Sequence, residues 1–351
     1  MSNRVTSSVV SCFLLAACAS VDPVREIVRE EMVLQKLPGA SIAIVEDGRI
    51  VRAEGFGFAN LEHAVPATEH TVYQSGSVGK QFTAALVMLL VQDGRIALDD
   101  PIGRHLPGTP ASWERITIRQ LLTHTSGLAD PYEALDLTRN YTEEELLAID
   151  ARVPVLFEPG ARFSYSNMGY HVLGFLCSRV GGKFYADQLV ERVFRPAGMT
   201  TARLIDEHDL VPRRAAGYEY EGDTPRNQRW VSPTLNTTAD GSVYLTVLDM
   251  AAWDLALTRG APIASELQAA MRASAALSDG KRSDYGFGWA LAPFEGRAAI
   301  SHGGAWQGFT TYYLRLPDEQ LSVIVFTNRS GAKPETIARR IAVERLRARG
   351  P

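Results

Sequence analysis

The feature that most constrains this chain is the stretch from Ser77 to Val91, which is apolar around almost its whole circumference when it is drawn as a helix. Asp93 and Gly94 end the apolar pattern. A helix without a polar face must be covered on every side by other elements. The sequence therefore predicts a central buried helix, and a chain of 351 residues is long enough to supply the surrounding core.

Both ends of the chain predict antiparallel strands beside a helix. Residues 23–37 show a helical spacing of apolar residues, and two β-branched runs then flank an Asp-Gly pair at 47–48, which is a strong signal for a hairpin. Residues 285–328 hold four short β-rich runs separated by turn residues, and residues 334–348 return to a helical pattern.

The middle of the chain, about residues 100–285, carries helical patterns divided by proline and glycine clusters. We therefore predict an α+β fold, in which both chain ends form an antiparallel β-sheet flanked by helices. Residues 23–348 would form a single domain. The mainly helical sub-domain would be inserted between the parts 23–99 and 286–348.

The first 18 residues have the pattern of an export signal. Arg4 precedes an apolar stretch from Val9 to Ala17, which is too short to span a bilayer, and Leu15 to Cys18 resembles a bacterial lipoprotein signal with Cys18 as the lipidated residue. A plain secretory signal and an accidental apolar start are the alternatives. We expect a protein of the bacterial cell envelope, exported to the periplasm, whose only membrane contact is a lipid on Cys18.

Several classes of partner are excluded by composition. The formal charge of -4 and the absence of a basic stripe or a DNA-binding motif argue against nucleic acid. The seven histidines show no ligand spacing, so we expect no metal, and nothing implies a cofactor. Cys177 lies on an apolar helical pattern and is expected to be a buried core residue.

Ser77 and Lys80 form the first candidate catalytic pair. A serine hydroxyl needs a neighbouring base, and residues i and i+3 share one face of a helix. To act as that base the lysine must be neutral, which requires burial or another cation to lower its pKa. The same spacing occurs in Ser278–Lys281 and Ser330–Lys333, but no apolar helix follows these two segments, so they are interpreted as exposed turns.

The second candidate is Tyr165-Ser166-Asn167, the only Tyr-x-Asn in the chain. A phenol close to a cation can be held as phenolate and act as a general base. The amide of Asn167 both donates and accepts hydrogen bonds, so it can bridge a lysine and a substrate. A turn with an aromatic anchor is the alternative interpretation.

The third candidate, His302-Gly303-Gly304-Ala305, leaves a β-rich run. The glycines would let a substrate lie against the strand edge, and the backbone N–H of Ala305 would be able to donate to a developing oxyanion. A glycine-rich turn with a surface histidine is the alternative here.

Together and in this order, the three motifs resemble the active-site set of the serine β-lactamase and penicillin-binding-protein superfamily, on its class C branch with D-Ala-D-Ala carboxypeptidases and related esterases. The resemblance covers roughly residues 24–345. Further segments that look like the same family are 121–128, 157–170, 195–200 and 285–289.

The resemblance implies a role for each motif residue. Ser77 would be the acylated nucleophile, and Lys80 and Tyr165 would shuttle its proton. Asn167 would hold the lysine and the substrate, and His302 would occupy the third-motif position with Gly303 and Gly304. The backbone N–H groups of Ser77 and Ala305 would form the oxyanion hole, while His124, in the segment 121–128, would be a structural loop residue rather than a base.

The departures from the family pattern narrow the expected function. Class C β-lactamases usually carry Lys-Thr-Gly where this chain has His302-Gly303-Gly304, so a formal charge and a hydroxyl are missing. A site without these donors binds a carboxylate poorly. We therefore expect a serine hydrolase that acts on esters or D-amino-acid peptides. The alternatives are a class C-like β-lactamase and a non-catalytic protein that binds cell-wall peptides.

Overall fold

The computed structural model describes residues 22–130, 132–205 and 209–350. The predicted signal sequence, with Cys18, lies outside these residues. The helices are α1 (Pro23–Leu34), α2 (Lys80–Gln92), α3 (Ile118–Leu122), α4 (Glu143–Asp150), α5 (Asn167–Gly181), α6 (Tyr185–Leu189), α7 (Arg195–Ala197), α8 (Val247–Thr258), α9 (Ser265–Met271) and α10 (Pro334–Ala348). The strands are β1 (Gly39–Glu46), β2 (Arg49–Asn60), β3 (Val65–Pro66), β4 (Tyr73–Gln74), β5 (Tyr218–Glu221), β6 (Thr224–Asn227), β7 (Tyr244–Leu245), β8 (Ile300–Trp306), β9 (Phe309–Leu316) and β10 (Leu321–Thr327).

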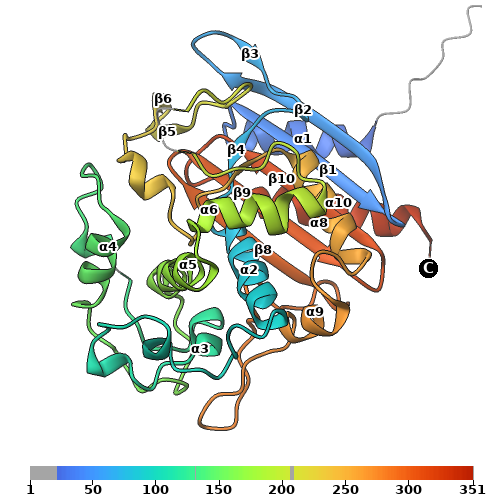
Figure 1. The fold of residues 1–351 in the computed structure, drawn as a ribbon. Helices are drawn as coiled ribbons and strands as arrows, with labels where there is room; N and C mark the ends of the chain where they lie inside the picture. The colour runs from blue at the N-terminus through green and yellow to red at the C-terminus, as the bar shows by residue number, and fades with distance from the viewer. Residues whose placement is uncertain (1–21, 131, 206–208, 351) are drawn as a thin grey trace, which may run out of the picture.

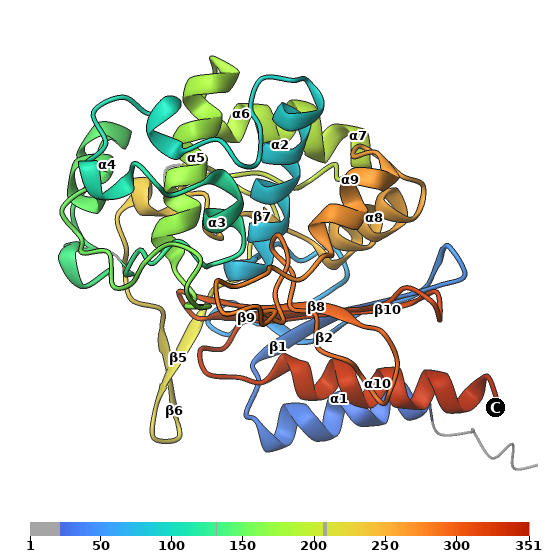
Figure 2. The same cartoon turned by 90° about the horizontal axis from the view of Figure 1, so that it is seen from below.

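Both ends of the chain build one antiparallel sheet, which confirms the predicted α+β fold. Its strand order is β3-β2-β1-β10-β9-β8, so the N-terminal strand β1 pairs directly with the C-terminal strand β10. Helices α1 and α10 cover one face, and the larger helical part, with α2 and α8, covers the other (Figure 1, Figure 2). Two hydrophobic cores result, one on each side of the sheet.

The predicted hairpin joins β1 to β2. Asp47 and Gly48 both have positive φ angles, 49° and 73°. This is the backbone conformation that a two-residue turn between twisted strands requires, and Asp-Gly adopts it readily. The hairpin at 47–48 is therefore confirmed.

Helix α2 is the predicted central helix, and every residue from Lys80 to Leu90 is buried. It begins later than the sequence pattern predicts, because Ser77 lies in a separate 3-10 turn, Gly76–Gly79. The tighter turn still places residues i and i+3 on one side. Ser77 and Lys80 therefore remain neighbours.

Two sequence interpretations differ from the structure. Residues 285–293 form no strand and contribute only isolated bridges, such as Tyr285 to Ala290. The hairpin of β5 and β6 interrupts the section predicted to be mainly helical, although α3 to α9 all lie within it. The limits of an inserted sub-domain at about 100 and 285 stay a prediction. Among the described residues, no helix is long and apolar enough to cross a membrane.

Candidate active site

The turn that carries Ser77 packs closely against strand β8, and the positions of closest approach are glycines. A Cβ on Gly76 would lie 2.4 Å from the backbone nitrogen of Ala305, and Gly76 has a φ of +49°. A Cβ on Gly304 would lie 2.0 Å from the carbonyl oxygen of Ser75 and 3.0 Å from the nitrogen of Ser77. The two backbones can approach this closely only because both positions lack a side chain.

Strand β8 is an edge strand, and its outer edge faces this turn. Ser301 exchanges two backbone hydrogen bonds with Ala290, of 2.8 and 3.0 Å, on the side away from β9. Because backbone groups alternate along a strand, Gly303 and Ala305 direct their N–H groups to the same outer side. The N–H of Ala305 therefore points toward the turn of Ser77.

Lys80 lies at the centre of the site and is completely buried. Its Nζ is 3.1 Å from Ser77 Oγ, 2.7 Å from Asn167 Oδ1 and 2.5 Å from the carbonyl oxygen of Asp240. Three acceptors match the three donors of an ammonium group. Of the two conditions expected for a lysine that acts as a base, burial is met, and a neighbouring cation is not among these contacts.

Asn167 begins helix α5, where the side chain of Ser166 caps the helix. While the amide oxygen of Asn167 accepts from Lys80, its Nδ2 donates to Asp130 Oδ2 at 2.8 Å. These two contacts fix which way the amide faces. The sequence analysis predicted the contact with Lys80 and missed Asp130, for which no spacing gave a signal.

Tyr165 precedes the cap and is 39% exposed. Lys80 Nζ lies 5.0 Å from the centre of its ring. The buried imidazole of His124 packs on the Tyr165 ring, with ring centres 4.1 Å apart, and its Nδ1 accepts the N–H of Ser166 at 3.2 Å. Burial, reinforced by the charge of Lys80, holds the pKa of His124 well below its usual value, so His124 is neutral and supports the Tyr165 loop.

His302 is buried rather than at the surface, and it carries no charge at neutral pH. Its Nδ1 is 2.6 Å from the Gly303 carbonyl oxygen, and its Nε2 is 2.7 Å from the hydroxyl of Tyr285. Nδ1–H therefore donates to the carbonyl, and Nε2 accepts from the phenol. Burial, reinforced by the charge of Lys80, lowers the pKa of His302 to about 4.

A cleft of about 560 Å³ brings the predicted residues together. It runs from Ser77 along β8 and β9 to the start of α10 and is lined by both the first and the third motif (Ser77, Tyr165, His302, Gly303, Gly304, Ala305, Thr310, Thr311, Tyr312, Ala332, Lys333, Pro334, Glu335 and Thr336). Lys80 and Asn167 do not line this cleft, but Lys80 Nζ contacts both Ser77 Oγ and Asn167 Oδ1. The competing pair Ser278–Lys281 is different, since the ammonium of Lys281 binds Asp279 at 2.7 Å in an exposed turn.

The neutral state of His302 predicts the pH dependence of the reaction. Because its pKa is lowered, this histidine gains a proton only as the pH falls through about 4. We expect the ratio of kcat/KM between wild type and His302→Gln, measured with a neutral ester, to be constant from about pH 5 to 8. A sigmoidal change of that ratio centred near the ordinary histidine pKa would contradict the buried, neutral assignment.

The chain resembles known proteins over most of its length. It is 30% identical over 310 residues to penicillin-binding protein 4* of Bacillus subtilis, which covers 82% of this chain and 68% of that protein. It is 32% identical over 308 residues to a D-aminopeptidase of Brucella anthropi, which covers 86% of this chain. The octameric penicillin-binding protein homologue from Pyrococcus abyssi superposes with a TM-score of 0.82 at 30% identity, over 94% of this chain and 78% of that chain.

The D-aminopeptidase is the longer protein, and the chain spans 58% of its length. The family model described as Beta-lactamase matches residues 24–347. These residues include all three motifs, the sheet and the central helix. This chain therefore belongs to the beta-lactamase family.

Proposed function

We propose that the protein is a serine hydrolase that cleaves ester or amide bonds, with small D-amino-acid derivatives or esters as substrates, through an acyl-enzyme on Ser77. The observation that carries the proposal is the contact of Lys80 with both Ser77 Oγ, at 3.1 Å, and Asn167 Oδ1, at 2.7 Å, in a cleft shared with Tyr165 and His302. The relatives named as a D-aminopeptidase and penicillin-binding proteins support this substrate class.

The site supplies each group that the reaction needs. Tyr165, as phenolate beside the ammonium of Lys80, accepts the Ser77 proton while Oγ bonds to the substrate carbonyl carbon. The N–H groups of Ser77 and Ala305 donate to the resulting oxyanion. Collapse of this intermediate breaks the bond to the leaving alcohol or amine, which takes the proton from Tyr165. Water then hydrolyses the acyl-serine by the same steps, with Tyr165 accepting the proton of the water.

The third motif argues against efficient hydrolysis of β-lactams. His302 is neutral and directs both ring nitrogens to protein partners, the Gly303 carbonyl and Tyr285. The following position is Gly303, which has no hydroxyl. A substrate carboxylate would therefore meet no charged donor from this motif, and a site without matching donors discriminates against such a substrate.

The experiment that tests the proposal has two parts. Purified protein is first treated with a fluorophosphonate and examined by intact and peptide mass spectrometry, where we expect one adduct on Ser77. A panel of nitrophenyl esters, D-Ala-D-Ala peptides, D-amino-acid amides and nitrocefin then ranks the substrates, with nitrocefin the poorest. No adduct and no turnover would instead favour a non-catalytic protein that binds cell-wall peptides, and fast nitrocefin turnover would favour a class C-like β-lactamase.

Tyr165→Phe tests the assignment of the base. Removal of the phenolic oxygen leaves the ring packed on His124 but takes away the proton acceptor. We expect kcat for a short-chain nitrophenyl ester to fall about 10²-fold or more, since general base catalysis typically contributes about 10² to 10⁴. Thermal unfolding should be close to that of wild type, because the ring is partly exposed. An unaltered kcat would remove Tyr165 from the mechanism.

We also propose that the protein is exported to the cell envelope and that Cys18 carries a lipid. The support is the sequence pattern of residues 1–18, which ends in a cysteine. In a bacterial host, the full-length chain should fractionate with membranes, and Cys18→Ser should move it to the soluble fraction. An unmodified Cys18 in a mature, soluble wild-type protein would contradict the anchor.

A further inference from the structure

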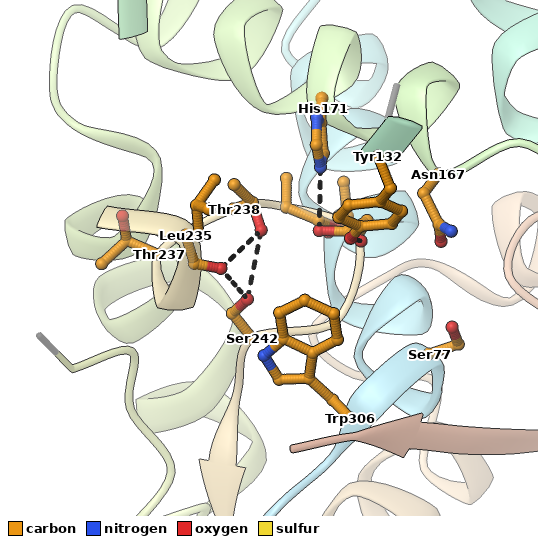
Figure 3. Close-up of polar contacts among 12 residues, drawn as sticks. Ser77, Tyr132, Asn167, His171, Leu235, Thr237, Thr238, Ser242 and Trp306 are labelled. Carbon is orange, nitrogen blue, oxygen red and sulfur yellow. Dashed lines mark hydrogen bonds and ion pairs between the residues drawn. The ribbon is translucent and has the colours of Figure 1, made fainter. Parts of the chain in front are cut away.

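A buried group of charged side chains lies directly behind the candidate active site. His171, one turn after Asn167 on α5, lies between Asp150 at the end of α4 and Asp240 in the loop before β7. His171 Nδ1 is 3.6 Å from Asp150 Oδ2, and Nε2 is 3.2 Å from Asp240 Oδ1. All three side chains are buried, and Figure 3 shows the ring of His171 beside Tyr132. We call these three residues the buried triad.

The surroundings favour the charged forms of His171 and Asp240, which we call the inner pair. Burial alone lowers the pKa of His171, but the carboxylates of Asp240 and Asp150 outweigh it and raise the pKa to about 10. Burial alone raises the pKa of Asp240, but His171 and then Lys80 outweigh it and hold that pKa far below the usual range. An imidazolium and a carboxylate therefore face each other, while burial raises the pKa of the outer Asp150.

Asp240 connects this charge pair to the catalytic groups. Its carbonyl oxygen accepts from Lys80 Nζ at 2.5 Å, and its carboxylate accepts from the hydroxyl of Tyr132. Tyr132 in turn packs near Trp306 on β8, with ring centres 5.6 Å apart (Figure 3). Asp240 is therefore connected to Lys80 directly and to strand β8 through Tyr132. The other titratable groups that act on the buried triad and its partners are Asp130, Tyr165 and Tyr185.

Core packing alone does not account for this arrangement. Charged groups lose their hydration on burial, and well-packed apolar residues of the same volume often give equal or greater stability. Several triad atoms, among them both Asp150 oxygens and both His171 nitrogens, make no hydrogen bond of good geometry. Costly ionisable groups in contact with a catalytic lysine are characteristic of functional sites.

We propose that the buried triad is a positioning device: His171, held by Asp150, fixes Asp240 so that its carbonyl orients Lys80 and its carboxylate sets the charge around Lys80 and Tyr165. This inference rests on the proposed function of Ser77, Lys80 and Tyr165. None of the three residues reaches the substrate cleft, so they act through Lys80 and Tyr132 rather than on the substrate.

The test measures the second-order rate of fluorophosphonate labelling at Ser77 as a function of pH. The variants are His171→Gln and Asp240→Asn, which each remove one charge and keep a polar side chain, and Asp150→Asn, which removes the outer charge. The matched control is His105→Gln. His105 also pairs with an aspartate, Asp100 at 2.8 Å, but it does not line the cleft that contains Ser77.

The variants should move the acid limb of the rate profile in opposite directions. Loss of the His171 charge leaves the Asp240 carboxylate unbalanced, which disfavours the Tyr165 phenolate and shifts the limb to higher pH. In Asp240→Asn the Asp150 carboxylate remains as the partner of the His171 imidazolium, so the balance of charge moves the other way and the limb shifts to lower pH. Asp150→Asn shifts the limb in the same direction as Asp240→Asn by a smaller amount, because its carboxylate is farther away. For His171→Gln and Asp240→Asn we expect the acid limb to shift by about half a pH unit or more. We also expect the labelling rate at the optimum pH to be at least several-fold lower than that of wild type.

Each outcome decides between these ideas. No labelling of wild type would remove the proposed function itself. If wild type is labelled and the folded variants keep its acid limb, or shift it in the same direction, the positioning role is wrong. Circular dichroism separates loss of fold from loss of rate. If Asp240→Asn does not fold, the signs for His171→Gln and Asp150→Asn decide, and loss of fold in all three would make the triad purely structural.

Discussion

Replacing Ser77 by alanine should lower kcat for a short-chain nitrophenyl ester by about 10⁴-fold or more, because the attacking oxygen is lost and the remaining groups cannot form an acyl-enzyme. The fold should persist. The substitution removes one hydrogen bond from Lys80, whose other two acceptors, Asn167 and Asp240, remain in place. Initial rates and fluorophosphonate labelling measure the loss, and thermal unfolding checks the fold.

Ser278→Ala is the matched control for this experiment. Ser278 has the same spacing to a lysine, but Lys281 binds Asp279 and the segment is an exposed turn. We expect wild-type rates from this variant. Turnover that survives in Ser77→Ala at a comparable level, with Ser278→Ala also active, would show that another group attacks the substrate and would end the assignment of Ser77.

Replacing Gly304 by alanine should damage both stability and activity. The new Cβ would lie 2.0 Å from the Ser75 carbonyl oxygen and 2.5 Å from Thr311 Oγ1, so β8 or the Ser77 turn must move. Overpacking of this kind costs about 1–3 kcal/mol or more in the free energy of unfolding. Displacement of an oxyanion donor costs about 10² to 10³ in kcat. Urea unfolding and ester hydrolysis measure the two effects.

The neighbouring Gly303 supplies the control. A Cβ there would meet its first neighbour, the ring of Tyr312, at 3.6 Å, which is ordinary van der Waals contact. Gly303→Ala should therefore unfold at nearly the wild-type urea concentration and lose much less activity than Gly304→Ala. Equal stability of the two alanine variants would show that the close packing of β8 on the Ser77 turn is not required.

The parts of the structure that sequence predicts well are those set by local pattern. The uniform apolar surface of 77–91 predicts the buried helix, and Asp47-Gly48 predicts a hairpin, because neighbouring residues determine both. Helix α10 has the predicted limits, Pro334–Ala348. The nucleophile pair was recognisable only together with the two later motifs, since the spacing of Ser77 and Lys80 occurs in three places.

The parts that sequence analysis missed depend on contacts between distant segments. Asp240 and Asp130 each bind a motif residue, yet nothing in their own neighbourhood marks them, because their partners are many positions away. Tyr285 lies in a segment that resembles the family, but its contact with His302 was not predicted. The β-rich composition of 285–293 predicts a strand, but the segment pairs only at bridges beside β8 and instead packs the ring of Tyr285 against His302. Its tertiary position outweighs its local preference.

The contact between the Ser77 turn and β8 also makes the proposed chemistry depend on the order in which the chain folds. The hydroxyl of Thr311 bonds the carbonyl of Ser75 across 236 positions of the chain. Contacts of such long sequence separation form late, after the entropy of closing the intervening loop has been overcome. A chain without β8 and β9 lacks the N–H of Ala305, which is the second donor proposed for the oxyanion. We therefore expect hydrolytic activity to report that folding is complete.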